Sequence, residues 1–125
     1  MKISRIGTRE ELDGLMETSR QHPVWILKHS LTCSISGAAL GEFRRYAAGI
    51  DDDEEIELGL LEIQNARPVS AEVERRTAVR HASPQAILLA DGRPVWHASH
   101  WRISAAALAQ AQCEHAPPRG RTAGA

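Results

Sequence analysis

Cys33 is the residue of this sequence best placed to do chemistry. It follows a short apolar run, Val24-Trp25-Ile26-Leu27, and precedes a predicted helix that begins at Ser34. The first turn of a helix carries unpaired backbone N–H groups and the positive end of the helix dipole. Both favour the thiolate, which is the nucleophilic form of cysteine. We therefore predict a reactive thiol at Cys33; the alternative is an inert, buried cysteine.

The neighbours of Cys33 indicate which thiol chemistry it could perform. Ser36 stands where a dithiol oxidoreductase carries its second cysteine, so no local C-x-x-C disulfide can close. Cys33 could instead attack a mixed disulfide and carry the departing thiol until another thiol removes it. We expect Ser36 to donate a hydrogen bond to the sulfur. We also expect Lys28, and His29 if it is protonated, to favour the thiolate by their charge.

Ser83-Pro84 is a second candidate for the site, because it directly precedes a predicted strand at Ala86–Leu89. A cis peptide bond before Pro84 would leave the backbone of Ser83 free to pair with an extended substrate segment. An ordinary trans proline ahead of a strand is the alternative.

A third candidate group follows the last predicted strand. Its two imidazoles, hydroxyl and indole could bind a polar small thiol if this loop returns beside the cysteine; they belong to His97, Ser99, His100 and Trp101. The alternative is that Trp96 and Trp101 pack in the interior and that the histidines are polar surface groups. Surface groups are also our interpretation of three other histidines, His22, His81 and His115.

Metal chemistry is not indicated by the spacing of the candidate ligands. His29 and Cys33 stand four residues apart, and His97 and His100 three, but no C-x-x-C or H-E-x-x-H pattern is present. We expect no native metal. The other cysteine, Cys113, falls late in the last predicted helix. We interpret it as a passive residue, with a thiol that resolves the Cys33 adduct as the alternative.

The order of predicted elements defines a fold. A capping box at Thr8, a hairpin signal at Asp91-Gly92 and a helix cap at Ser104 mark boundaries. The first half is predicted to contain a short opening strand at Lys2–Ile6, a helix over roughly residues 9–20, a strand at Val24–Leu27 and a polar turn from Lys28 to Thr32. A second helix starts at Ser34, with Ile35, Ala38, Ala39, Phe43 and Tyr46 on one side, and an acidic loop follows at 51–55. The second half is predicted to contain a strand at Ile56–Ile63, a helix capped by Ser70, a hairpin of Ala86–Leu89 with Val95-Trp96, and a last helix. A βαβ unit followed by a helix and a hairpin predicts an α/β, thioredoxin-like fold with a central mixed sheet flanked by helices. We expect one domain over residues 1–116 and a flexible tail over 117–125.

Composition narrows the function classes. The chain has 125 residues, 42% of them apolar and 25% charged, with a net charge of −1. Nothing electrostatic therefore points to nucleic acid or to an anionic membrane surface. Its apolar runs are far shorter than the roughly 20 residues of a membrane helix, and Met1 to Leu12 lacks a secretory signal. Two cysteines are too few for a disulfide scaffold, so we expect the reducing cytoplasm.

At these residues the sequence resembles the YtxJ-like bacilliredoxins, monothiol thioredoxin-fold proteins of the bacillithiol system. The resemblance runs from about Pro23 to Ile103. It is carried by Lys28-His29-Ser30, Thr32-Cys33-Ser34-Ile35-Ser36, Asn65-Ala66-Arg67-Pro68, Arg80-His81-Ala82-Ser83-Pro84-Gln85 and Val95-Trp96-His97-Ala98-Ser99-His100-Trp101. The tryptophan–histidine string is the most specific of these.

The resemblance implies a bacterial, cytoplasmic protein that removes bacillithiol from client proteins held as mixed disulfides. Cys33 would receive the bacillithiol and be regenerated by another thiol or a dithiol reductase. No bound cofactor is implied, only bacillithiol as a co-substrate. Lys28, Thr32 and Ser34 would contact substrate. One residue departs from the family pattern, since Ser34 stands where the family usually has proline. We expect its additional N–H to stabilise the thiolate further.

Three alternatives remain open at the level of sequence. The carried thiol could be another small thiol such as glutathione. The protein could be an adaptor of thioredoxin fold whose cysteine is not turned over, or a stress sensor that accumulates the adduct. A thiol pKa well below its ordinary value favours catalysis, and an unshifted or raised one favours the adaptor.

Overall fold

A five-stranded mixed sheet in the order β1-β3-β2-β4-β5 is the centre of the computed structural model, which describes residues 1–117. The strands are β1 (Ser4–Arg5), β2 (Val24–His29), β3 (Glu57–Glu62), β4 (Gln85–Ala90) and β5 (Arg93–Ser99). β3 pairs in parallel with β1 and β2, whereas β4 pairs antiparallel with β2 and β5. The predicted central mixed sheet is confirmed.

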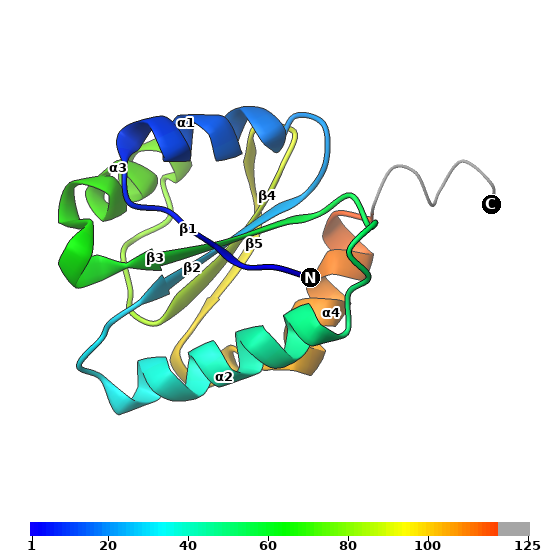
Figure 1. The fold of residues 1–125 in the computed structure, drawn as a ribbon. Helices are drawn as coiled ribbons and strands as arrows, with labels where there is room; N and C mark the ends of the chain where they lie inside the picture. Colours follow the sequence, from blue (N-terminus) through cyan, green and yellow to red (C-terminus); the bar gives the residue numbers. More distant parts are fainter. Residues whose placement is uncertain (118–125) are drawn as a thin grey trace.

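Two helices cover each face of the sheet (Figure 1). One pair is α1 (Arg9–Thr18) and α3 (Arg67–Thr77), and the other is α2 (Ser34–Ala48) and α4 (Ala105–His115), with short 3-10 turns η1 (Ile63–Asn65) and η2 (His100–Arg102). Side chains alternate between the faces along each strand. Trp25 and Leu27 of β2 therefore pack in the core beneath α2 and α4, while Val24 and Ile26 pack in the core beneath α1 and α3.

A buried hydrogen-bond network joins β2 to both helices of the α2/α4 face. The Trp25 indole donates to the Tyr46 hydroxyl of α2 (3.1 Å) and to the Gln112 side-chain oxygen of α4 (2.9 Å). The Trp25 ring also meets Tyr46 and Trp96 edge-on. Burial raises the pKa of Tyr46 to about 12, so this hydroxyl stays protonated and the network keeps one arrangement.

The local signals at three element boundaries are confirmed. Thr8 and Glu11 form both hydrogen bonds of a capping box at the start of α1. Asp91 and Gly92 both have positive φ, 54° and 79°, as the tight turn between β4 and β5 requires. Ser104 caps α4 through a hydrogen bond that its hydroxyl accepts from Ala107 N–H (3.1 Å).

Several predicted boundaries are wrong. Lys28 and His29 belong to β2 rather than to a turn, because both pair with β3 and Lys28 also pairs with β4. α3 begins at Arg67, three residues before Ser70, since Pro68 is favoured in a first helical turn. Ser70 thus lies inside the helix, where it is buried. On α2, Ala38 is exposed and does not belong to the buried stripe.

Two further predictions concern the ends of the chain and membranes. The opening strand exists but is confined to Ser4–Arg5. Apart from Pro117, the predicted tail lies outside the described residues. Among residues 1–117, no helix combines the length and apolar character needed to cross a membrane.

Candidate active site

The site is built at one edge of the sheet, where β2 ends and α2 begins. Cys33 follows the end of β2 by four residues and is the N-cap of α2, with extended backbone angles (φ −108°, ψ 127°). β4 starts at this same edge directly after Pro84, and β5 ends there, because Lys28 pairs with Gln85 and Gln85 pairs with Ser99. The three candidate stretches of the sequence therefore meet at one edge. Cys33 is a partly exposed residue.

The first turn of α2 stabilises the Cys33 thiolate. Backbone N–H groups of Ser36 and Ile35, in that order of importance, and the Ser36 hydroxyl hydrogen-bond to the sulfur and lower the pKa of Cys33. Burial acts in the opposite direction but does not outweigh them. The predicted lowering by a helix start is thus present. The amide of Ser34 is not among the donors that lower the pKa, contrary to the expectation for this position.

Ser36 also links the start of α2 to the loop that precedes it. It is completely buried, and its hydroxyl accepts a hydrogen bond from Ser30 N–H (3.2 Å) in addition to its contact with the sulfur. The His29 ring, buried at the end of β2, donates through Nδ1 to the Ser36 carbonyl (3.2 Å). His29 therefore anchors α2 to the end of β2.

Gln64 is a residue of the site that the sequence analysis missed. Its side-chain oxygen accepts from Leu31 N–H (3.0 Å), and its amide nitrogen donates to the Ser30 hydroxyl (2.9 Å). The loop that presents Cys33 is thus held from η1, which follows β3. A signal was present, because the carboxyl ends of two parallel neighbouring strands meet at the same edge. Thr32, at the same loop, lies at the limit of hydrogen-bond distance from Gln64 (3.5 Å).

The Ser83–Pro84 peptide bond is cis. Pro84 is buried, and its carbonyl accepts a hydrogen bond from His100 N–H (3.1 Å), which ties η2 to this segment. The Ser83 hydroxyl is buried without a hydrogen-bond partner in the described part of the chain. Trp101, next to His100, is 73% exposed and is not a packing residue.

Three other predicted site residues lie on the opposite face of the sheet from α2. Ala98 packs in the core beneath α2 and α4, so its strand neighbours His97 and Ser99 face the α1/α3 side. Lys28 alternates with Leu27 in the same way, and its ammonium nitrogen lies 3.0 Å from Nδ1 of His81. The structure thus places Cys33, Ser36, Pro84 and His100 at one edge of the sheet, and directs the side chains of His97, Ser99 and Lys28 to the α1/α3 face.

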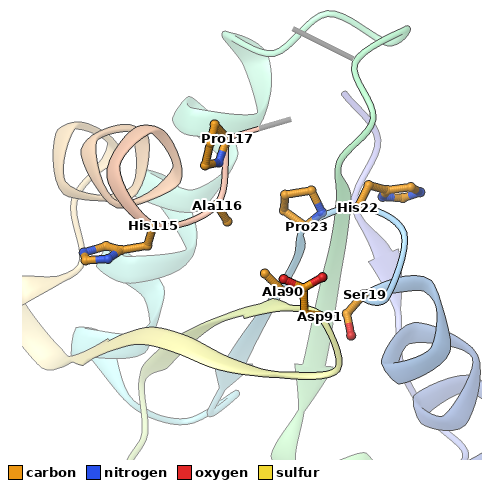
Figure 2. A pocket seen from close by; sticks show the side chains of 8 residues that line it. All are labelled: Ser19, His22, Pro23, Ala90, Asp91, His115, Ala116 and Pro117. Atoms are coloured by element: carbon orange, nitrogen blue, oxygen red, sulfur yellow. The ribbon is translucent and has the colours of Figure 1, made fainter. Parts of the chain in front are cut away.

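A small cavity lies at the far edge of the sheet, where β2 begins and α4 ends (Figure 2). It has a volume of about 130 Å³ and is lined by Asp91 and two histidines, His22 and His115. Figure 2 shows the two imidazoles on opposite sides of the cavity, pointing away from each other. Among residues 1–117, no three His, Cys, Asp or Glu side chains gather as metal ligands.

Cys113 lies far from Cys33. It borders a cavity with Tyr46, Gly49 and Ile50, at the carboxyl end of α2, whereas Cys33 caps the amino end. A helix of 15 residues is roughly 22 Å long at 1.5 Å per residue. A disulfide requires Cα atoms within about 7 Å of each other. Cys113 is therefore placed too far away to resolve an adduct on Cys33 of the same chain.

Ser36→Ala is expected to raise the pKa of Cys33 while leaving it below its ordinary value. The substitution removes the hydroxyl donor but keeps both backbone donors, which include the largest cause of the lowering. The pH dependence of iodoacetamide alkylation measures this pKa directly. An unchanged pH profile would mean that the Ser36 hydroxyl does not contact the sulfur.

A sheet of this order, with two helices on each face, a cis-proline before β4 and one cysteine at the start of α2, defines a monothiol protein of thioredoxin fold. Solved structures agree. A protein described as a candidate oxidoreductase with a thioredoxin fold matches with a TM-score of 0.76 and 28% identity, covering 88% of this chain and 93% of the other. Thioredoxin of Fasciola hepatica matches with a TM-score of 0.72 and 15% identity (90% and 98% covered), and thioredoxin NaTrxh of Nicotiana alata with 0.73 and 11% (92% and 93%).

The family follows from the sequence itself. Residues 4–108 match the family of the monothiol bacilliredoxin BrxC. The chain belongs to this family, and family and fold together assign it to the thiol oxidoreductases.

Proposed function

We propose that this protein removes bacillithiol from client proteins by thiol–disulfide exchange through Cys33. The observation that supports the proposal most is the position of Cys33, a partly exposed residue whose sulfur receives two backbone N–H groups and one hydroxyl at the start of α2. A lowered thiol pKa provides the attacking thiolate at neutral pH. The name of the family supports bacillithiol as the carried thiol.

The proposed reaction has two steps. The Cys33 thiolate attacks the bacillithiol sulfur of the client's mixed disulfide, a new S–S bond forms to Cys33, and the client leaves as a thiolate that takes a proton from water. A second thiol then attacks the bacillithiol sulfur, which releases Cys33 as a thiolate and carries bacillithiol away in a disulfide. The second thiol comes from a small molecule or from a dithiol reductase, and we place the reaction in the cytoplasm.

Substrate contacts are proposed for the residues that surround the sulfur. Thr32 and Ser34 flank Cys33 and are both exposed, and we propose that the backbone of Ser83, ahead of Pro84, pairs with an extended client segment. His100 is exposed and tied to Pro84. His97 and Ser99, on the other face, would reach substrate only around the edge of β5.

The deciding experiment is intact mass spectrometry after mixing the reduced protein with a bacillithiolated client. A parallel sample contains a glutathionylated client. The proposal expects one bacillithiol on this protein and a free client thiol, with less transfer of glutathione. Equal transfer of both would make the protein a monothiol carrier without preference for bacillithiol. No transfer from either client would leave the adaptor role in its place.

Ser34→Pro, which restores the residue usual for the family, is expected to leave the pKa of Cys33 unchanged. Ser34 is the first residue of α2, where proline fits without losing a helical hydrogen bond. The donors to the sulfur belong to Ile35 and Ser36, and both remain. The midpoint temperature of thermal unfolding should rise, because proline lowers the conformational entropy of the unfolded chain and so stabilises the fold by about 0.4–1 kcal/mol. A raised pKa in alkylation experiments would show that Ser34 N–H acts on the sulfur.

A further inference from the structure

Lys28 is a completely buried lysine that the proposed reaction does not use. It lies on β2 near the site edge, with its side chain on the α1/α3 face. Its ammonium nitrogen is 3.0 Å from Nδ1 of His81, and Glu74 of α3 acts on its charge. A buried charge is costly unless it is paired, and an apolar side chain of similar size would avoid this cost. We therefore infer that Lys28 has a role other than stabilising the fold.

The protonation states of the pair are set by their surroundings. Burial lowers the pKa of Lys28 to about 8, a shift that Glu74 opposes. Burial and the charge of Lys28 lower the pKa of His81, again opposed by Glu74. At pH 7 the lysine is thus an ammonium and the imidazole is neutral. Lys28 then donates to Nδ1 of His81, whose proton resides on Nε2.

The segment that His81 belongs to leads straight to the site. His81 N–H donates to the Glu74 carboxylate (2.6 Å), and the amide nitrogen of Gln85 donates to the Arg80 carbonyl (2.8 Å). The first bond ties the start of residues 80–85 to α3, and the second joins the two ends of this segment, which contains Ser83–Pro84. Pro84 in turn holds His100 through its carbonyl.

Two features show that the surroundings of Lys28 and His81 are polar. The Gln85 side chain is 2% exposed, is the register partner of Lys28, and keeps its oxygen without a hydrogen-bond partner in the described chain. A cavity of about 260 Å³ between α3 and the segment is lined by Ser70, Glu74, His81 and also Arg67. The titratable groups that act on Lys28 are thus His81 of the segment and Glu74 of α3, and Arg67 of α3 lines the cavity beside these two residues.

We propose that Lys28 is a positioning residue for thiol exchange: through His81 it holds residues 80–85, and so sets the Ser83–Pro84 backbone at the edge that a protein client must approach to reach Cys33. This rests on the proposed exchange with protein mixed disulfides. Lys28 does not act on the sulfur itself, because its ammonium is directed to the opposite face of the sheet from α2.

Lys28→Met tests the proposal, with Lys2→Met, at the exposed lysine of the chain, as the matched control. We expect Lys28→Met to fold, to keep the pH profile of Cys33 alkylation, and to raise KM for a protein mixed disulfide about tenfold with little change in kcat. His81→Leu should produce the same KM, and the double variant should be no worse than either single one. Additive losses, or an unchanged KM, would overturn the proposal.

Two readouts without a client separate this inference from the proposed function. In Lys28→Met, amide hydrogen exchange over residues 80–85 should accelerate, and the pKa of His81 measured by NMR should rise because the neighbouring positive charge is gone. If the wild type transfers no thiol yet both changes appear, the proposed function is wrong, but Lys28 does hold residues 80–85 in place. If neither appears, Lys28 does not hold this segment, whatever the exchange assay shows.

Discussion

Cys33→Ser is expected to abolish thiol transfer while preserving the fold. The hydroxyl that replaces the thiol is not ionised at neutral pH, so no nucleophile remains at the start of α2. Serine is also a favoured N-cap residue, whereas Cys33 makes no side-chain capping hydrogen bond. The free energy of unfolding should therefore stay the same or rise by up to about 1 kcal/mol. Intact mass spectrometry with a bacillithiolated client measures the transfer, and urea unfolding measures the stability.

Cys113→Ser is the control for this experiment. Cys113 is exposed and borders the carboxyl end of α2, so its loss should leave transfer nearly at the wild-type rate. If Cys33→Ser transferred bacillithiol at the wild-type rate, Cys33 would not be the nucleophile. A severe loss in Cys113→Ser would instead mean that a second molecule supplies Cys113 as the resolving thiol.

Ser36→Cys is expected to convert the monothiol site into a dithiol one. The Ser36 hydroxyl already hydrogen-bonds to the Cys33 sulfur, so a thiol in its place would stand in reach of a disulfide. After Cys33 takes up bacillithiol, the new thiol would attack the Cys33 sulfur, close an internal disulfide and expel bacillithiol as a free thiol. The stable product would change from a protein mixed disulfide to an oxidised protein two hydrogens lighter than the reduced one, which intact mass detects.

The Ser36→Cys variant also has an expected cost. Ser36 is fully buried and accepts a hydrogen bond from Ser30 N–H, and sulfur is a weak acceptor. We expect the reduced variant to be about 1 kcal/mol less stable to unfolding. Persistence of the bacillithiol adduct on Cys33 would show that the side chain at position 36 does not face the sulfur.

Features governed by nearby residues were predictable from the sequence. The β2–α2 junction follows from an apolar run and a helix start a few residues apart, and it fixes Cys33 as an N-cap with a lowered pKa. The capping box at Thr8 and the turn at Asp91-Gly92 are local in the same sense. Even so, α3 begins four residues earlier than a cap at Ser70 predicts, because its N-cap is Ala66 and Pro68 lies in its first turn.

Features that depend on the order and faces of the sheet were not predictable from one sequence. Strand alternation puts Lys28 and Leu27 on opposite faces, but only the packing of α2 and α4 shows which face carries the cysteine. That choice separates Lys28 from the sulfur and directs it to His81, 53 positions away in sequence. Gln64 reaches the active loop for a similar reason, since β2 and β3 run in parallel and end side by side.

The sequence by itself determined that this protein has a cysteine at the start of a helix and no partner thiol at position 36, because both properties depend on a few adjacent residues. The tertiary structure decided what surrounds that cysteine. In the folded chain Gln64 holds the loop before Cys33 and His29 bonds to the first turn of α2. Pro84 bonds to His100, and Cys113 lies at the far end of α2. These contacts join residues distant in sequence, and they form only when burial of both apolar faces fixes the sheet and the helices against each other.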